Sequence, residues 1–422
     1  MLEQYFVRPK TIDRIHSCWI GKAIERYVAW LEEQGYAARN VFSRVPILVW
    51  FGEFTHRRGV SDWSELPEHI EPFIECWLKE HGKGETNDPR RGTASRAIRN
   101  PIHQLIRLIL PGYSNSGRSV SDPFVDSAPD FFSFLRKQRG LKETTLIQYR
   151  HYLRRFEDYL CSNGLQAFSG LSSAVLSAFI TETGRELDKR SVQSLCSILK
   201  TFLRYLFYAR LQTRDLSQQI ESPRHYRLAN LPRSISWDEV RQMLETVDRR
   251  TPAGKRDFAI LLLLVTYGLR AREVAALTLD DIDWKRERVH IPERKSGHAA
   301  RYPLSSIVGE AVLAYLQHGR PKPNAGTRAL FLRAFAPYTP LSWNAVSLRA
   351  KYYLRKAGIE VPRPGSHTLR HTCVQRLVDA HVSLKTIGDY VGHQTPDATK
   401  IYTKVDIERL REVALGIEED IL

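Results

Sequence analysis

The sequence predicts a mainly α-helical protein with one small antiparallel β-sheet, in which helical modules precede a mixed α/β domain. Three observations support this fold class. Apolar residues recur at helical spacing between residues 146 and 206. In residues 286–305, apolar and polar side chains alternate on either side of a turn at Ser296 and Gly297. This pattern predicts a β-hairpin. Residues 111–123 and 221–234 are rich in turn-forming residues or bounded by proline, and they lack periodicity, so we expect them to be linkers.

These linkers divide the 422 residues into parts of ordinary domain size. We expect an N-terminal helical module at residues 1–110, a linker at 111–123, a helical DNA-binding bundle at 124–220, a basic linker at 221–234, and a mixed domain with a C-terminal tail at 235–422.

The N-terminal module is expected to repeat the bundle. Residues 34–60 align with residues 139–165 without a gap, which pairs Gly35 with Gly140 and Gly59 with Gly164. Two unrelated amphipathic helices that end in glycine would also align in this way. A duplicated DNA-binding module is the interpretation that we favour.

The bundle carries two apolar stripes and basic residues outside them. One stripe contains Leu146, Tyr149, Leu153, Phe156 and Leu160, and the other contains Val192, Leu195, Leu199, Phe202 and Leu206. Basic residues of the bundle and of the second linker form the candidate DNA-binding set: Arg150, Arg154, Arg155, Lys200, Arg204, Arg224, Arg227 and Arg233.

The mixed domain is expected to begin with a helix at Ser236, because Ser236 and Glu239 have capping-box spacing. A helix through residues 258–265 precedes the hairpin. The chain is expected to become helical again after Pro364 and Gly365.

The charge balance favours a polyanionic partner. Lys and Arg number 63 against 47 acidic residues, a formal charge of +16 with a pI near 9.6, so nucleic acid is the leading candidate. The longest apolar run, residues 258–265, is too short to span a bilayer, and no signal peptide is visible. Five scattered cysteines indicate neither disulfides nor a zinc knuckle. We therefore expect a cytoplasmic protein without a membrane partner.

Four stretches of the mixed domain hold cationic or nucleophilic side chains: "TYGLRARE", "ERKSGH", "SHTLRH" and "VGHQTPDATKIY". They supply Arg270, Lys295, His367 with Arg370, and His393 with Tyr402. Breaking a phosphodiester without a metal requires fixed donors for the non-bridging oxygens, and arginine provides a permanent charge in a planar fork. The leaving oxygen also needs a proton, which a lysine on a hairpin turn could deliver.

Tyr402 is the available nucleophile. A phenol with a pKa near 10 is protonated at neutral pH, so it needs a cationic pocket to react. A phosphotyrosine conserves the bond energy, so a strand could be resealed without ATP.

The four motifs, in this order, resemble those of the tyrosine recombinase family, also called phage-type integrases. "TYGLRARE" is similar to the family's first arginine box, with Tyr267 inserted before the glycine. The H-x-L-R-H box stands at residues 367–371, and Val391 replaces leucine in the L-G-H box. The interval of nine residues from His393 to Tyr402 also matches.

This resemblance implies the roles of individual residues. It assigns Arg270, His367, Arg370 and His393 to the scissile phosphate, Glu273 to support of Arg270, and Tyr402 to nucleophilic attack. It places Lys295 in the turn between two strands, where Arg294 and Arg301 are competitors for its role.

The resemblance also implies a core-binding (SAM-like) middle domain and a site-specific recombinase that needs neither metal nor nucleotide cofactor. Its partners would be double-stranded recombination sites, held by four protomers that exchange C-terminal tails and are joined in some cases by other recombinase subunits. The extra N-terminal module favours an integrase of a mobile element, acting at the nucleoid.

Other interpretations remain open. A type IB topoisomerase shares the tyrosine chemistry, and a catalytically silent DNA-binding protein could keep the fold. His367 and His371 have a spacing that suits zinc, and Asp280, Asp281 and Asp283 could suggest a two-metal nuclease. Threonine follows His367 where a glutamate would be expected, and adjacent carboxylates more often form turns and caps, so neither metal site is expected. The tail could also pack on its own domain.

Overall fold

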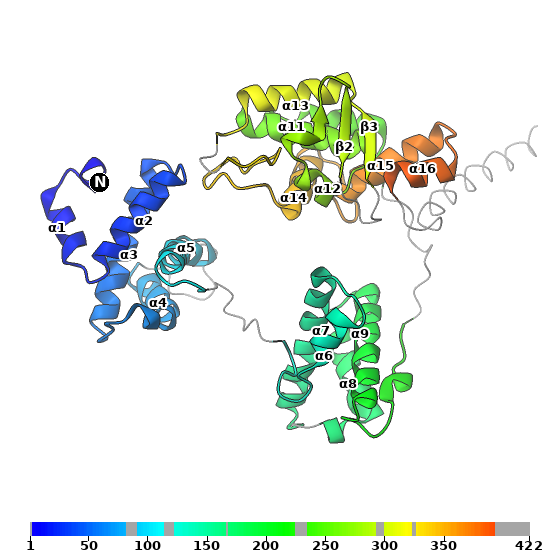
Figure 1. The fold of residues 1–422 in the computed structure, drawn as a ribbon, viewed down its shortest axis with the longest axis horizontal. Helices are drawn as coiled ribbons and strands as arrows, with labels where there is room; N and C mark the ends of the chain where they lie inside the picture. Colours follow the sequence, from blue (N-terminus) through cyan, green and yellow to red (C-terminus); the bar gives the residue numbers. More distant parts are fainter. Residues whose placement is uncertain are drawn as a thin grey trace, which may run out of the picture. The chain divides into compact units, whose positions relative to one another are not determined.

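A computed structural model of the chain describes residues 2–81, 91–113, 122–165, 168–223, 234–292, 299–322 and 326–392 (Figure 1). The chain forms two compact units. One unit is Ser116–Asn230, and the other combines Met1–Asn115 with Leu231–Leu422. Three large groups of buried apolar side chains form separate cores, one from residues 2–109, one from 124–220 and one from 235–369.

Among the described residues, the N-terminal core is built by five α-helices and two 3₁₀ helices. The α-helices are α1 (Pro9–Ser17), α2 (Gly21–Glu33), α3 (Ala38–His56), α4 (Ile70–Glu80) and α5 (Arg91–Ile109), and the 3₁₀ helices are η1 (Leu2–Gln4) and η2 (Trp63–His69). Helix α5 packs against α2, α3 and α4, so it is central to this core.

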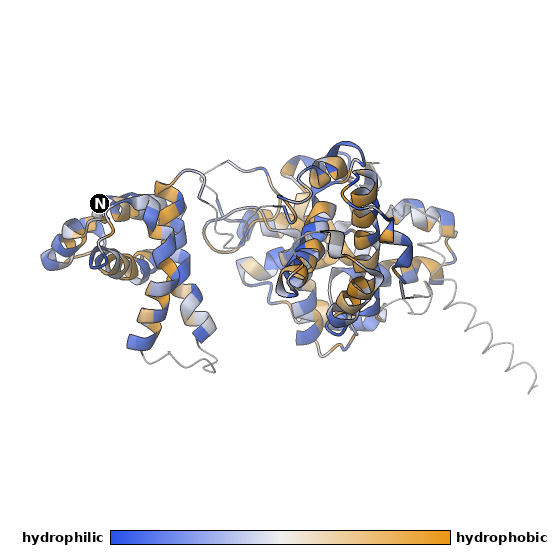
Figure 2. Ribbon diagram, turned by 90° about the horizontal axis from the view of Figure 1, so that it is seen from below, coloured by the Kyte–Doolittle hydropathy of each residue, from blue (hydrophilic) through white to orange (hydrophobic). Residues whose placement is uncertain are grey.

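The middle unit contains α6 (Phe131–Lys137), α7 (Glu143–Ser162), η3 (Phe168–Gly170), α8 (Ser173–Gly184), α9 (Lys189–Tyr208) and η4 (Leu216–Gln219). The two predicted stripes lie on α7 and α9. Every member is buried except Val192, which is partly buried. Most helices of the chain carry both hydrophilic and hydrophobic residues (Figure 2), as expected for helices that cover a core with one face.

The segments that were aligned as a repeat have the same local geometry. Helix α3 begins at residue 38 and α7 at residue 143, which is the offset of the alignment. Gly35 and Gly140 precede them with φ of 74° and 58°, and Gly59 and Gly164 follow them with φ of 79° and 71°. Both helices therefore enter and leave through left-handed glycines at equivalent positions.

The third core belongs to the C-terminal part. Its helices are α10 (Trp237–Glu245), α11 (Pro252–Tyr267), α12 (Ala271–Ala276), α13 (Ser306–His318), α14 (Trp343–Lys356), α15 (Ser366–Asp379) and α16 (Leu384–Val391), with η5 at Leu279–Asp281. The predicted capping box of Ser236 and Glu239 is present. Helix α11 carries the predicted apolar run and is almost wholly buried, with α13 and α15 packed against it.

A three-stranded antiparallel sheet of order β1-β2-β3 completes this part. The strands are β1 (Ile282–Asp283), β2 (Arg288–Ile291) and β3 (Ala300–Pro303), and Val289 pairs with Tyr302. The predicted fold class is confirmed, because the described residues are mainly helical with one small antiparallel sheet. In the described ranges, no helix is long and apolar enough to cross a membrane.

Candidate phosphate-binding site

The first arginine of the candidate site stands at the sharp junction between α11 and α12. Helix α11 ends at Tyr267, and its C-cap residue Gly268 has a φ of 60°. A Cβ atom there would lie 3.1 Å from a Val391 methyl and 3.2 Å from Cys373 Sγ. Glycine is required by both the backbone conformation and the close packing. Arg270 then becomes the N-cap residue of α12.

Glu273 fixes the orientation of Arg270. Its side chain is only 3% exposed, and its carboxylate accepts hydrogen bonds from the Arg270 backbone N–H and from Nη1, both at 2.8 Å. The Arg270 side chain is 20% exposed, so its guanidinium reaches the surface while Glu273 holds its backbone N–H and Nη1. Nη2 of the same guanidinium donates to the Gly392 carbonyl at 2.8 Å.

Arg370 lies on α15 and is 5% exposed. Its Nη1 donates to the Gly268 carbonyl, and its Nη2 donates to the Val391 carbonyl at 2.6 Å. Arg270 and Arg370, the arginine pair, therefore bind consecutive carbonyls at the C-terminal end of α16. The structure brings together two cations that are 100 residues apart in sequence, at the turn that leads directly to His393.

His367 is the third candidate in this region. It lies one turn before Arg370 on α15 and is exposed. Partial desolvation of the ring lowers its pKa below the usual 6.5, and the charges of Arg370 and Arg270 lower it further. The surroundings of His367, including the charges of the arginine pair, therefore favour its neutral imidazole over the protonated form.

Lys295, His393 and Tyr402 lie outside the described residues. Their flanking elements are described: β2 and β3 pair on either side of the Lys295 segment, and α16 ends at Val391, before His393. Arg224, Arg227 and Arg233 of the second linker also lie outside the described residues, as does the C-terminal tail.

The acidic residues of "LDDIDW" have structural contacts. Asp280 forms a bidentate ion pair with Arg328, and Asp281 accepts hydrogen bonds from the N–H and hydroxyl of Thr278 at 2.7 Å. Asp283 accepts from the Arg286 backbone N–H at 3.0 Å. Among the described residues, no group of three or more His, Cys, Asp or Glu side chains is placed to hold a metal ion.

The candidate DNA-binding residues of the middle unit differ in their contacts. Arg150 is tied to Asp122 at 2.6 Å and to Glu143 at 2.5 Å, and Arg155 lies 3.6 Å from Glu186. Arg204 is exposed and donates to Ser217 Oγ at 3.3 Å, while Arg154 and Lys200 are half-buried. Arg150 thus contributes to an internal ion-pair network, which the helical pattern of α7 did not reveal.

Two residues near the arginine pair were missed by the sequence interpretation. The guanidinium of Arg272, on α12, lies over the Trp343 ring at the start of α14, 5.1 Å from its centroid. Both side chains are exposed, and Trp343 is 49% exposed. Two sequence features could have revealed these residues. Arg272 lies two positions after Arg270, and Trp343 directly follows the N-cap residue Ser342.

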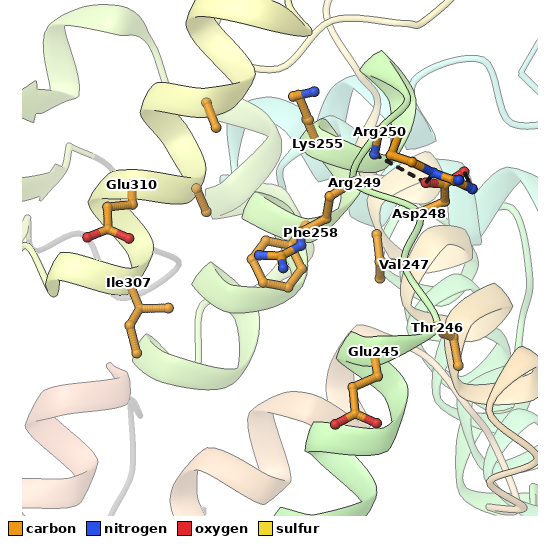
Figure 3. Close-up of a pocket in the computed structure, with 12 residues that line it drawn as sticks. Glu245, Thr246, Val247, Asp248, Arg249, Arg250, Lys255, Phe258, Ile307 and Glu310 are labelled. Carbon is orange, nitrogen blue, oxygen red and sulfur yellow. Dashed lines mark hydrogen bonds and ion pairs between the residues drawn. The ribbon is translucent and has the colours of Figure 1, made fainter.

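A separate hollow lies among the end of α10, the start of α11 and α13 (Figure 3). There Arg250 pairs with Asp248, and Arg249 covers the Phe258 ring. None of the candidate site residues lines this hollow, so we do not assign the site to it.

Comparisons with known proteins agree with this geometry. Residues 233–409 match the phage integrase family, and residues 129–209 match the phage integrase N-terminal SAM-like domain. A Sinorhizobium fredii protein named "Putative integrase/recombinase y4rF" is 30% identical over 98% of this chain and 95% of its own length. The tyrosine recombinase XerC of Oceanobacillus iheyensis is 29% identical over 67% of this chain and 92% of its own length.

The fold is also similar to that of a solved structure, the XerH site-specific recombinase bound to palindromic difH substrate in a post-cleavage complex. The TM-score is 0.56 with 18% identity, over 68% of this chain and 84% of that one. The matched families, the relative that spans nearly the whole chain and the arginine boxes around Arg270 and Arg370 lead to one conclusion: this chain belongs to the phage integrase family of tyrosine recombinases.

Proposed function

We propose that this protein is a site-specific DNA recombinase that cuts and rejoins strands through a 3′-phosphotyrosyl bond on Tyr402. The observation that carries the proposal is the convergence of Arg270 and Arg370 on the turn at residues 391–392. That turn is followed at once by His393 and, nine residues later, by Tyr402. A metal-free phosphoryl transfer to a phenol needs fixed positive charge at the phosphate, and the arginine pair supplies two permanent charges.

In the proposed reaction, the Tyr402 oxygen attacks phosphorus and the bond from phosphorus to the 5′-oxygen breaks. Negative charge on the non-bridging oxygens is met by the arginine pair, with His393 as a further ligand. Lys295 gives its proton to the 5′-oxygen. The lowered pKa of His367 keeps its imidazole neutral, so that it can accept the phenol proton. A 5′-hydroxyl of the partner strand then attacks the phosphotyrosine and reverses these steps.

DNA sites are the proposed substrate, and the exposed pair of Arg272 and Trp343 extends the proposed contact surface beyond the phosphate. A guanidinium over an indole offers charge to the backbone and an apolar face to a sugar or base. In the middle unit, the proposed phosphate contacts are Arg154, Arg155, Lys200 and Arg204. Arg150 is proposed to stabilise the fold of the middle unit through its ion pairs instead of contacting DNA.

The N-terminal 110 residues are proposed to be a helical module with a role of their own. The XerC relative matches about two thirds of this chain, whereas the y4rF relative matches almost all of it. The module has 16 basic residues against 14 acidic ones. Arg91 pairs with Glu75, and Arg99 pairs with Glu71. Contacts with partner subunits suit this balance of charges better than the DNA binding expected of a duplicated DNA-binding module.

By its family, the assembly is proposed to be a tetramer on two duplexes, with tails exchanged between protomers and other recombinase subunits as possible members. An element-encoded integrase is the favoured biological role, and it is supported by the extra N-terminal module and by a relative, covering 98% of this chain, that is named "Putative integrase/recombinase y4rF". The place of action is proposed to be the cytoplasm, at the nucleoid.

The test uses nicked DNA that carries a candidate element end, incubated in EDTA and resolved on a denaturing gel. We expect a protein-linked 3′ strand from the wild type and none from Tyr402→Phe. A requirement for Mg²⁺, or an unchanged product from the variant, would refute the proposal. Relaxation of any supercoiled plasmid by monomers would instead identify a type IB topoisomerase. DNA binding without a covalent product from the wild type would identify a silent DNA-binding protein.

A further inference from the structure

Three tyrosines connect the segments that carry the candidate catalytic residues. Tyr267 ends α11 just before Arg270, Tyr302 lies on β3 beyond the Lys295 segment, and Tyr390 lies in α16 before His393. The ring centroids of Tyr267 and Tyr302 are 5.1 Å apart, and those of Tyr302 and Tyr390 are 4.9 Å apart. We call these three residues the tyrosine cluster.

The hydroxyls of the cluster bind backbone atoms of neighbouring segments. Tyr302, which is 4% exposed, donates its hydroxyl to the Tyr390 carbonyl. The Tyr390 hydroxyl donates to the Thr266 carbonyl at 3.2 Å. The Tyr267 hydroxyl donates to the Pro303 carbonyl at 2.9 Å and accepts from the Ser305 N–H at 3.0 Å. Each hydrogen bond therefore joins two of the three segments.

These contacts do not hold the end of α16 and strand β3 equally. The end of α16 is bound by the arginine pair, through the Val391 and Gly392 carbonyls, and by the Tyr390 hydroxyl. Strand β3 is joined to the same region by the hydroxyls of Tyr302 and Tyr267. Removing the Tyr302 hydroxyl would leave α16 with its other contacts and would mainly loosen the hairpin.

We propose that Tyr302 is a positioning residue that fixes the β2–β3 hairpin relative to the arginine pair, so that Lys295 reaches the leaving 5′-oxygen. This inference rests on the proposed function and adds a residue to it. Proton transfer needs donor and acceptor within hydrogen-bond reach, and a displacement of about 1 Å can slow a reaction roughly 100-fold. A hairpin held at one edge by a buried hydroxyl is sensitive to displacements of this size.

The test compares cleavage of ordinary nicked DNA with cleavage of the same DNA containing a bridging 5′-sulfur at the scissile phosphate. A thiolate leaves without a proton, because its conjugate acid has a pKa of about 8.5. We expect Tyr302→Phe to cleave ordinary DNA about 10- to 100-fold more slowly than the wild type and the sulfur substrate within about threefold of it. Lys295→Ala is expected to show the same rescue.

Tyr315→Phe is the matched control. Tyr315 is equally buried in the same domain, and its hydroxyl accepts from the Leu332 N–H at 3.2 Å, outside the tyrosine cluster. Its rate ratio between the two substrates should equal that of the wild type. Tyr267→Phe, which removes the hydrogen bond from Tyr267 to the Pro303 carbonyl of β3, should be rescued like Tyr302→Phe and provides a second variant.

Equal slowing of Tyr302→Phe on both substrates, or no slowing on either, would overturn the positioning role. Rescue of Tyr302→Phe without rescue of Lys295→Ala would also overturn it, because the effect would not pass through the lysine. These results differ from failure of the proposed function itself, in which the wild type forms no covalent product with either substrate.

Discussion

Arg370→Lys is expected to loosen α16 as well as to impair cleavage. Arg370 is buried, and its two terminal nitrogens bind the Gly268 and Val391 carbonyls. A lysine ammonium keeps the charge but lacks the fork that spans two carbonyls. Loss of one hydrogen bond to a charged group costs about 1.5–3 kcal/mol, so local opening of the end of α16 should become roughly 10- to 150-fold more frequent.

Hydrogen–deuterium exchange with mass spectrometry is the suitable assay, because the chain has several cores and a global melting curve would mix their transitions. Peptides that cover residues 384–392 should exchange faster in Arg370→Lys. The exposed Arg355 of α14 provides the control, since Arg355→Lys should leave these peptides unchanged. If residues 384–392 of the Arg370→Lys protein exchanged at the same rate as in the wild type, the conclusion that this arginine holds the end of α16 would be refuted.

Three other predictions concern binding, the middle unit and pH. Trp343→Ala should weaken DNA binding about fivefold, measured by fluorescence anisotropy. Arg272→Gln should reduce, by about one, the slope of the logarithm of the binding constant against the logarithm of the salt concentration, measured in the same way. Arg150→Gln should lower the stability of the middle unit, seen as faster hydrogen exchange in α7, and change DNA affinity less than Lys200→Gln. Because the folded protein resists protonation of His367, the free energy of unfolding of its domain should fall as pH drops below about 6.5. His367→Gln should reduce this fall, measured from hydrogen exchange of α15 peptides in increasing urea at pH 7.5 and 5.5.

The sequence predicted the elements whose signals are local. The stripes of α7 and α9 repeat every three or four residues, and the cap of α10 depends on two residues three positions apart. The family resemblance implied the support of Arg270 by Glu273, and the structure shows its form: the buried carboxylate at the N3 position of α12 reaches back to the N-cap residue. Such relations are written within a few residues, so one chain is enough to find them.

The contacts of the arginine pair could not be predicted in this way. Their acceptors are the carbonyls of Gly268, Val391 and Gly392, and every residue type has a carbonyl, so no side-chain pattern marks these positions. The ion pair of Arg150 with Asp122 could not be predicted from the helical pattern for a related reason. Asp122 lies 28 residues away, at the end of a segment expected to be a linker.

The arginine pair has a consequence for how a phosphate would be received. The guanidinium of Arg270 carries five N–H donors, and it already donates to the Glu273 carboxylate and to the Gly392 carbonyl. A phosphate can bind other donors of Arg270 and leave these contacts intact, or it can displace the carbonyls of Val391 and Gly392. Displacement would release the turn that leads to His393 and Tyr402, so that arrival of the scissile phosphate and placement of the nucleophile would be one linked event. The exchange measurement on residues 384–392, repeated with DNA bound, distinguishes these routes: faster exchange would indicate displacement of the carbonyls, and slower exchange would indicate phosphate binding without displacement.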